Sequence, residues 1–157
     1  MEIRDAETAD LGAIVGIYNG LIETTTYAYT DWGDVTTVTN PRGFDTVSTV
    51  NEYGWVTAVT TDSPQSYETT YTYDANGNVT QRDVENVDKT NTRDTGNPWF
   101  TTTYDYDLLD NRTEKVEEID ASHTRTWEYA YTPNERLSVL TQPEGNEVQY
   151  VYDERDL

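Results

Sequence analysis

The side chains best suited to chemistry in this 157-residue chain are one histidine and many carboxylates. His123 follows Ser122, but neighbouring side chains on a strand point to opposite faces, so they cannot act as a nucleophile–base pair. We expect a surface histidine. Because the chain has 30 Asp and Glu residues, close acidic pairs arise by chance, and we assign no glycosidase-like dyad. The sequence therefore predicts no catalytic residue and no enzyme.

One acidic segment has a spacing that resembles a calcium loop. Asp74-x-Asn76-Gly77-Asn78 is followed by Glu85, but an EF-type loop needs glycine where Val79 stands. We therefore predict a turn at this segment.

The chain contains no cysteine, so disulfides and metals bound by thiolates are excluded. We assign no metal ligand and no cofactor, and calcium binding elsewhere on the acidic surface stays an open hypothesis.

The composition restricts the classes of partner. The net charge is −20, whereas nucleic-acid binding needs a basic surface, and no apolar run reaches the roughly 18 residues of a membrane span. We therefore expect neither partner.

The composition also bears on whether the chain folds. Low hydrophobicity (34%) is typical of disorder, but 13 Tyr with abundant Thr and Val favour a folded β protein. Habitat, solubility and cation binding all remain explanations for the acidity.

The elements that position these residues form a repeat. Tyr71-Thr72-Tyr73-Asp74-Ala75-Asn76-Gly77-Asn78-Val79-Thr80 is its clearest copy, and degenerate copies run from about residue 26 to the C-terminus. Tyr-x-Tyr puts both rings on one face of a strand, and Asp-x-x-Gly is typical of a turn. The repeat-defining residues are Tyr27, Tyr29, Gly33, Gly54, Tyr71, Tyr73, Asp74, Gly77, Tyr104, Tyr106, Asp107, Tyr129, Tyr131, Tyr150, Tyr152 and Asp153.

Each unit therefore predicts one β-hairpin plus a connecting turn, as at Asn40-Pro41-Arg42-Gly43 and Gln142-Pro143-Glu144-Gly145. The last copy is cut off by the chain end. Asp110, Glu135 and Asp156 take the place of the turn glycine, and because a left-handed residue costs more there, we expect turns of a different type.

This pattern resembles the YD repeat of RHS proteins, whose unit is roughly Tyr-x-Tyr-Asp-x-x-Gly-Arg-Leu/Val. The resemblance covers residues 26–157. It implies a segment of a β-shell of the kind that encloses secreted bacterial toxins, at the cell surface or outside the cell. The self-cleavage aspartates of that family are not found, since Pro143-Glu144-Gly145 is preceded by Gln142.

The N-terminus differs from the repeat. Residues 1–23 predict a short strand and a helix at 9–22 that covers a face or an edge of the sheet. Residues 1–25 resemble the opening of GNAT acetyltransferases of the phosphinothricin branch, on Ile3-Arg4-x-Ala6, Asp10-Leu11-x-Ala13-Ile14 and Ile17-Tyr18-Asn19. The family's acetyl-CoA turn is not found after residue 31. The acidic first ten residues do not fit a signal peptide.

A long interval separates two repeats at Gln81–Phe100. We predict a surface loop there, either stapled to the sheet by Trp99 and Phe100 or binding a partner through these two anchors.

The predicted fold is mainly β, an antiparallel hairpin-repeat sheet with a short N-terminal strand and one α-helix. The predicted function is a non-catalytic structural module. The alternatives are a GNAT acetyltransferase and a carbohydrate- or protein-binding surface. Self-association through a sheet edge or the helix is the expected partnership, and the origin of the chain as fragment, natural fusion or engineered chimera stays open.

Overall fold

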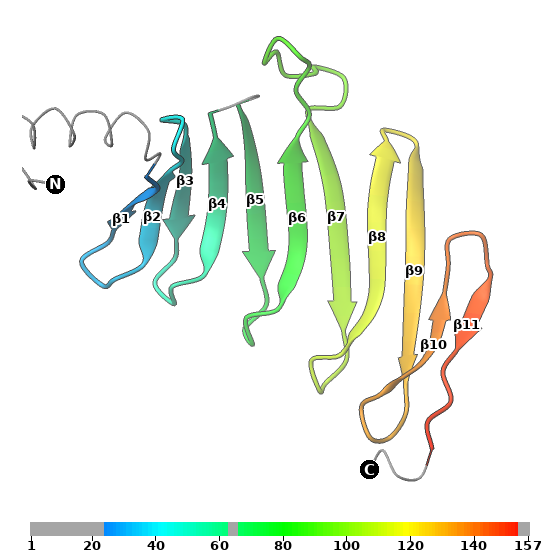
Figure 1. Cartoon of the computed structure of the whole chain (residues 1–157). Helices are drawn as coiled ribbons and strands as arrows, with labels where there is room; N and C mark the ends of the chain where they lie inside the picture. The colour runs from blue at the N-terminus through cyan, green and yellow to red at the C-terminus, as the bar shows by residue number, and fades with distance from the viewer. Residues whose placement is uncertain (1–23, 63–65, 154–157) are drawn as a thin grey trace, which may run out of the picture.

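The computed structural model describes residues 24–62 and 66–153. They form one 11-stranded sheet in which every strand pairs antiparallel with the next along the chain (Figure 1). The strands are β1 (Thr26–Tyr29), β2 (Val35–Thr39), β3 (Asp45–Val50), β4 (Val56–Thr61), β5 (Tyr67–Tyr73), β6 (Val79–Glu85), β7 (Trp99–Tyr106), β8 (Arg112–Asp120), β9 (His123–Tyr131), β10 (Leu137–Thr141) and β11 (Glu147–Gln149).

The predicted antiparallel hairpin-repeat sheet is confirmed. Threonine, valine and tyrosine dominate the strands, as in β7, and these residues suit a half-buried pleated surface. The predicted N-terminal strand and the helix at 9–22 lie outside the described residues. The described residues contain strands, turns and loops but no helix, and so none with the length and hydrophobicity of a membrane span.

The two faces of the sheet differ in chemistry, as the register of the strands shows. Cross-strand neighbours share a face, so Thr69, Val84 and Phe100 form one row. We call their side the aromatic face. It also carries Tyr27, Tyr29, Val38, Val59, Tyr67, Tyr71, Tyr73, Thr102, Tyr104, Tyr106, Trp127, Tyr129, Tyr131 and Leu140.

The opposite side is the threonine face, which is polar and acidic. Thr70, Asp83 and Thr101 form one of its rows, and Asp105, Glu114 and Glu128 form another. It continues with Thr37, Thr60, Thr103, Thr126, Thr141 and Glu147. Val47, Val116, Val139 and Trp99 also stand on this side, so it is mostly but not wholly polar.

The sheet has no second layer among the described residues. None of their hydrophobic side chains is buried, and Thr69 (6% exposed) and Thr102 (8% exposed) are the only buried residues among them. Both threonines stand on the aromatic face, between larger side chains of their own strands. Since a domain ordinarily buries its apolar face against another layer, the hairpins here are held mainly by their neighbours in the sheet.

Candidate functional site

Most of the turns close in the same way, and the β8–β9 turn, where Asp120 pairs with His123, is a shorter exception. At Asp74 the backbone N–H donates to the carbonyl of Asn78 (3.0 Å), and the Asp74 carbonyl accepts from the N–H of Gly77 (3.3 Å). The same pair of bonds closes the turns that begin at Thr30, Asn40, Asn51, Asp88, Asp107, Thr132 and Gln142. The two connecting turns predicted at Asn40 and Gln142 are therefore confirmed as members of this set.

The first side chain of the turn satisfies its backbone. The Asp74 Oδ1 accepts from the N–H groups of Asn76 and Asn78, each at 2.9 Å, and Asp74 Oδ2 accepts from the Asn78 side chain. The Asn78 side-chain amide is the main cause that holds the pKa of Asp74 below its ordinary value. This geometry explains why Asp, Asn or Thr begins most of these turns, and it confirms a turn at the calcium-like segment.

The fourth residue of each turn has a positive φ. Glycine fills this position at Gly33, Gly54 and Gly77. Asp110 (φ 64°) and Glu135 (φ 61°) adopt the same conformation without glycine, so the expectation of a different turn type is wrong for both. Asp156 lies outside the described residues.

Asp110 has a contact that offsets its backbone strain. Its Oδ1 accepts from the side-chain amides of Asn76 (2.8 Å) and Asn78 (2.6 Å), which belong to the preceding hairpin turn. A carboxylate that accepts from two amides makes strong hydrogen bonds. These bonds between turns offset the cost of a positive φ that glycine would avoid. Asp110 therefore links two hairpins at the turn end of the sheet.

Gly77 is required for a second reason besides its φ of 93°. A Cβ at this position would lie 2.8 Å from the Trp55 ring. That ring packs between Tyr53 and Tyr73, with centroid separations of 5.0 and 5.2 Å. The turn of one hairpin thus closes over an aromatic residue of the preceding one.

The second tyrosine of Tyr-x-Tyr has a specific hydrogen bond. Pairing between successive hairpins stops short of the turn: β6 and β7 pair at Gln81 and Thr103 but not at Val79. The Tyr106 hydroxyl bridges this gap by donating to the Val79 carbonyl at 2.9 Å. Burial raises the pKa of Tyr106, although nearby Arg112 opposes the shift.

The same bond recurs along the sheet, and we call the set the tyrosine ladder. Tyr73 donates to the carbonyl of Val56 (2.6 Å), Tyr131 to that of Arg112 (2.9 Å) and Tyr152 to that of Leu137 (2.8 Å). In β3 this place belongs to Val50, which has no hydroxyl. Each acceptor is the residue after the turn of the preceding hairpin.

The remaining repeat-defining residues lie where the pattern puts them. Tyr27 and Tyr29 are in β1, 55% and 59% exposed, with their rings 6.5 Å apart. Tyr71, Tyr104 and Tyr129 occupy the aromatic face two residues before the ladder tyrosines, Asp107 begins the β7–β8 turn, and Tyr150 and Asp153 follow β11. Tyr71, Tyr73 and Asp74 border an open hollow of about 570 Å³ together with Tyr53 and Trp55. The structure therefore arranges these residues as a framework along the sheet, and only these three members of the set line that hollow.

Sequence reasoning missed the cations that cover the aromatic rings. The Arg112 guanidinium lies 4.6 Å from the Tyr129 ring centre and 5.7 Å from that of Tyr104. Lys115 stands 4.6 Å from the ring of Trp127, and Arg136 stands 5.1 Å from that of Tyr152. The alternation of side chains along a strand was the only signal in the sequence. It shows that Lys115 stands opposite Trp127 only after the pairing of β8 with β9 is known.

The predicted loop at Gln81–Phe100 is shorter than expected. Gln81 belongs to β6, while Trp99 and Phe100 begin β7, so the connection comprises residues 86–98 and projects beyond the strand ends (Figure 1). Trp99 and Phe100 are successive strand residues on opposite faces. They therefore cannot act together as anchors for one partner.

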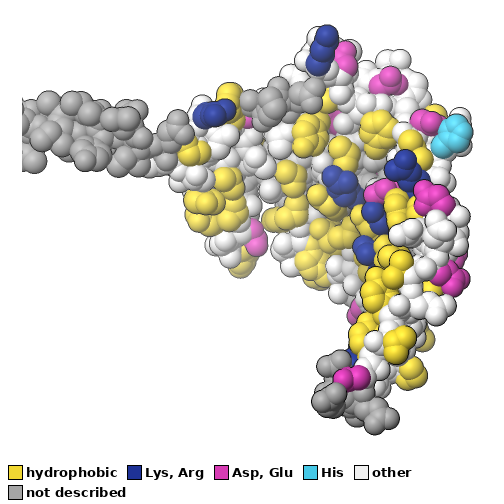
Figure 2. Space-filling view, turned by 45° about the vertical axis from the view of Figure 1, so that its right-hand side comes forward, with side chains coloured by type: hydrophobic (Ala, Val, Ile, Leu, Met, Phe, Trp, Pro, Cys, Tyr) yellow, Lys and Arg dark blue, Asp and Glu magenta, His cyan; other side chains and the backbone are white. Residues whose placement is uncertain are grey.

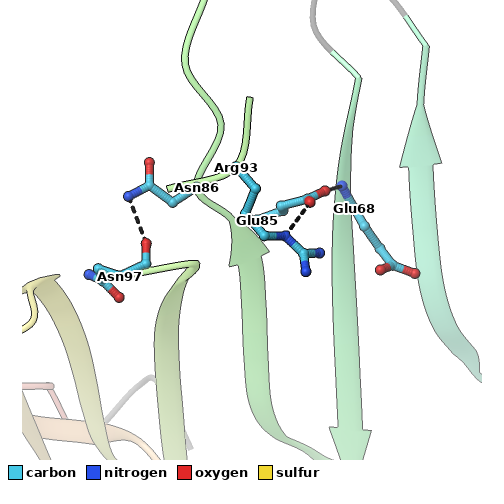
Figure 3. A network of polar contacts seen from close by, with 5 residues as sticks. All are labelled: Glu68, Glu85, Asn86, Arg93 and Asn97. Carbon is cyan, nitrogen blue, oxygen red and sulfur yellow. Dashed lines mark hydrogen bonds and ion pairs between the residues drawn. The ribbon is translucent and has the colours of Figure 1, made fainter. Parts of the chain in front are cut away.

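A polar network holds this loop to the sheet (Figure 3). The Glu85 carboxylate pairs with Arg93 and accepts from the backbone N–H of Glu68 at 3.0 Å, while the Asn86 side chain donates to the Asn97 carbonyl at 2.9 Å. Arg93 also lies 4.8 Å from the centre of the Trp99 ring. These contacts support the stapling role for Trp99.

His123 is a surface residue, as predicted. Its side chain is 71% exposed, and its Nδ1 lies 2.8 Å from Oδ1 of Asp120. Ser122 stands in the turn before β9, where its backbone N–H donates to Asp120. That bond is the main cause that lowers the pKa of Asp120. The three residues border an open hollow of about 370 Å³ on the threonine face, and no serine–histidine bond forms there.

Among residues 24–62 and 66–153 no group of three or more His, Asp or Glu side chains has the arrangement of a metal site. The hypothesis of calcium binding stays a prediction.

One comparison with known families identifies part of the framework. Residues 51–86 match the RHS repeat. This segment contains β4, β5 and β6 with the turns at Asn51 and Asp74. The chain therefore contains an RHS repeat, as the sequence predicted. The search of curated proteins found no match.

Proposed function

We propose, from the RHS repeat that this chain contains, that it is a non-catalytic structural module. It serves as a segment of an RHS-type scaffold whose sheet is extended by adding hairpins, and such scaffolds surround secreted toxins. The observation that carries this proposal is the tyrosine ladder. Each bond joins one hairpin to the next, so the sheet grows by a local rule.

The energetics of the sheet support a scaffold. In a repeat protein each unit contacts only its neighbours, and stability is approximately a sum of unit and interface terms. The contacts that join hairpins here are of that kind: Tyr106 to Val79, and Asp110 to Asn76 and Asn78. Nothing in this arrangement requires a closed core.

The use of the polar groups also supports a structural role. The carboxylates of Asp74, Asp88 and Asp107 accept hydrogen bonds from their own turns. A catalytic acid or base must instead have an atom within hydrogen-bonding reach of a substrate. The most regular acidic residues of the chain therefore stabilise backbone.

Calorimetry with acetyl-CoA separates this proposal from the acetyltransferase alternative. We expect no heat of binding at millimolar ligand from a folded protein, whose sheet is verified by circular dichroism. Micromolar binding of acetyl-CoA would overturn the non-catalytic proposal.

Hydrogen exchange followed by mass spectrometry tests the local growth rule. A scaffold held by neighbours opens hairpin by hairpin, so we expect graded protection along the strands. A single cooperative opening of all strands would contradict it.

The toxin association is tested in the genome of origin. We expect a toxin-encoding gene beside this one, and its absence argues against the association.

A further inference from the structure

With the exception of Glu117, the basic and acidic side chains assigned by strand register occupy opposite faces of the central strands. Arg82 on β6 pairs with Thr102 on β7, which pairs with Glu117 on β8, which pairs with Arg125 on β9. All four therefore stand in one row of the aromatic face. Lys115 pairs with Trp127 one row away.

The acidic residues of the same strands lie on the other side. Asp83, Asp105, Glu114 and Glu128 belong to the threonine face, and Glu117 is the exception on the aromatic face. Figure 2 shows Lys and Arg side chains gathered among hydrophobic ones over the middle of one face. A chain of net charge −20 thus presents a local cationic surface.

Two cations on this surface, Arg112 and Lys115, are held by contacts within the sheet. Arg112 stacks against Tyr104 and Tyr129, and Lys115 stands over Trp127 while it pairs with Glu117 (2.5 Å). An arginine stacked on an aromatic ring keeps the N–H donors at its edge for a carboxylate. Holding the side chain beforehand lowers the entropy that a ligand must offset.

The hydrogen-bonding capacity of these cations is not exhausted within the sheet. Arg112 Nε is buried and has no hydrogen-bond partner. Arg125 is exposed at the end of the cationic row. Arg112 Nε lies too deep for an outside group to reach, whereas the exposed Arg125 can pair with an outside carboxylate.

We infer that the aromatic face of β6–β9 is a docking surface for an acidic, amphipathic polypeptide segment. Carboxylates of the partner meet Arg82, Lys115 and Arg125, and its apolar side chains cover the row of Val84 and Phe100. Arg82 and Arg125 are three strand spacings apart, about 14 Å. Residues i and i+4 of an extended peptide that crosses the strands span about the same distance.

The charge and the ring contacts disfavour other occupants. Sugar stacking needs open ring faces, but cations cover those of Tyr129 and Trp127. Nucleic acid and anionic membranes carry dense charge that a −20 chain repels beyond the local surface. The screening length of about 8 Å at physiological salt lets a short peptide respond to the cationic row alone.

The test is fluorescence anisotropy with a fluorescein-labelled peptide of alternating glutamate and valine. The double variant Arg82→Gln/Arg125→Gln removes the ends of the row. Arg42→Gln/Lys89→Gln is the matched control, because it removes two positive charges from exposed turns away from the row. We expect the row variant to weaken binding about tenfold or more, and the control to change it less than about twofold. Raising the salt concentration weakens binding to the unchanged protein.

Several outcomes overturn the inference. The first is a glutamine–valine peptide that binds as tightly as the glutamate–valine peptide, and the second is an equal loss of affinity in the two double variants. The others are tighter binding of heparin or anionic vesicles than of the peptide, and no saturable binding at about 1 mM peptide. Circular dichroism establishes that each variant keeps its sheet. This inference goes beyond the scaffold role, since a folded sheet without peptide affinity overturns docking alone.

Discussion

The hydroxyl of Tyr106 donates to the backbone carbonyl of Val79 across the boundary between two hairpins, at 2.9 Å. Strand pairing between β6 and β7 does not reach Val79, so the side chain satisfies a carbonyl that the ladder of backbone bonds leaves out. The regular tyrosine of the repeat is therefore a hydrogen-bond donor as well as an apolar side chain.

Replacing Tyr106 by phenylalanine keeps the ring and removes this donor. We expect Tyr106→Phe to lower the free energy of unfolding by about 1 kcal/mol, because the Val79 carbonyl loses its partner. Urea denaturation followed by circular dichroism measures the change. Tyr104→Phe is the matched control on the same strand, and an equal loss in both variants would show that the bond to Val79 is unimportant.

The close approach of Gly77 to Trp55 predicts unequal costs for two chemically identical substitutions. Gly33→Ala meets no atom within 4 Å, so it carries only the strain of positive φ, about 1 kcal/mol. Gly77→Ala adds a contact at 2.8 Å with the Trp55 ring and is expected to cost about 1–3 kcal/mol more. Thermal melting of the two variants compares them, and equal shifts in Tm would contradict the packing of Trp55 under this turn.

Asp110 and Glu135, two of the three non-glycine residues with a positive φ, predict opposite responses to glycine. Glu135→Gly relieves a positive φ and is expected to stabilise the protein by about 0.5–1 kcal/mol. Asp110→Gly relieves the same strain but removes the acceptor of Asn76 and Asn78, so we expect no gain or a loss. Urea midpoints decide this, and equal stabilisation by both variants would mean that the bonds between turns contribute nothing.

The Asp74 turn predicts a pH dependence. Hydrogen bonds, that of the Asn78 side chain first, lower the pKa of Asp74 in the folded protein. The resulting stability is present above the unfolded pKa of about 4 and is lost as the pH falls through the folded pKa. Asp74→Asn keeps an oxygen acceptor that does not titrate, so its Tm should fall less than that of the unchanged protein between about pH 4 and pH 2.

The control for this measurement is Glu52→Gln, which removes one charge from an exposed turn position. If Glu52→Gln flattens the acid limb as much as Asp74→Asn does, the effect comes from net charge and not from the turn.

The repeat could be predicted from the sequence because its signals are local. Tyr71-x-Tyr73 and Asp74-x-x-Gly77 specify a strand and a turn through alternation, side-chain bonding to the backbone and a positive φ. The C-terminal end of β6 and the N-terminal end of β7, which border the long connection, could not be predicted from local signals. Gln81–Glu85 looks like a polar loop because its side chains are mostly polar, and pairing with β5 on one side and β7 on the other makes it a strand.

The framework contacts and the candidate docking surface required the register. Arg82 and Arg125 are 43 positions apart in the sequence, and only the alignment of the intervening strands puts them in one row. The opposite faces of Trp99 and Phe100 likewise follow from their place in β7, which their position beside a polar segment concealed.

The sequence by itself determined the hairpin as the unit, the location of most turns and the absence of cysteine chemistry, since each depends on residues within one repeat. The tertiary structure alone decided which groups of different hairpins meet: Tyr106 with Val79, Asp110 with Asn78, and Arg112 with Tyr129. These contacts depend on how far one hairpin is shifted against the next. That shift is set by the combined pairing of whole strands, which no single repeat encodes.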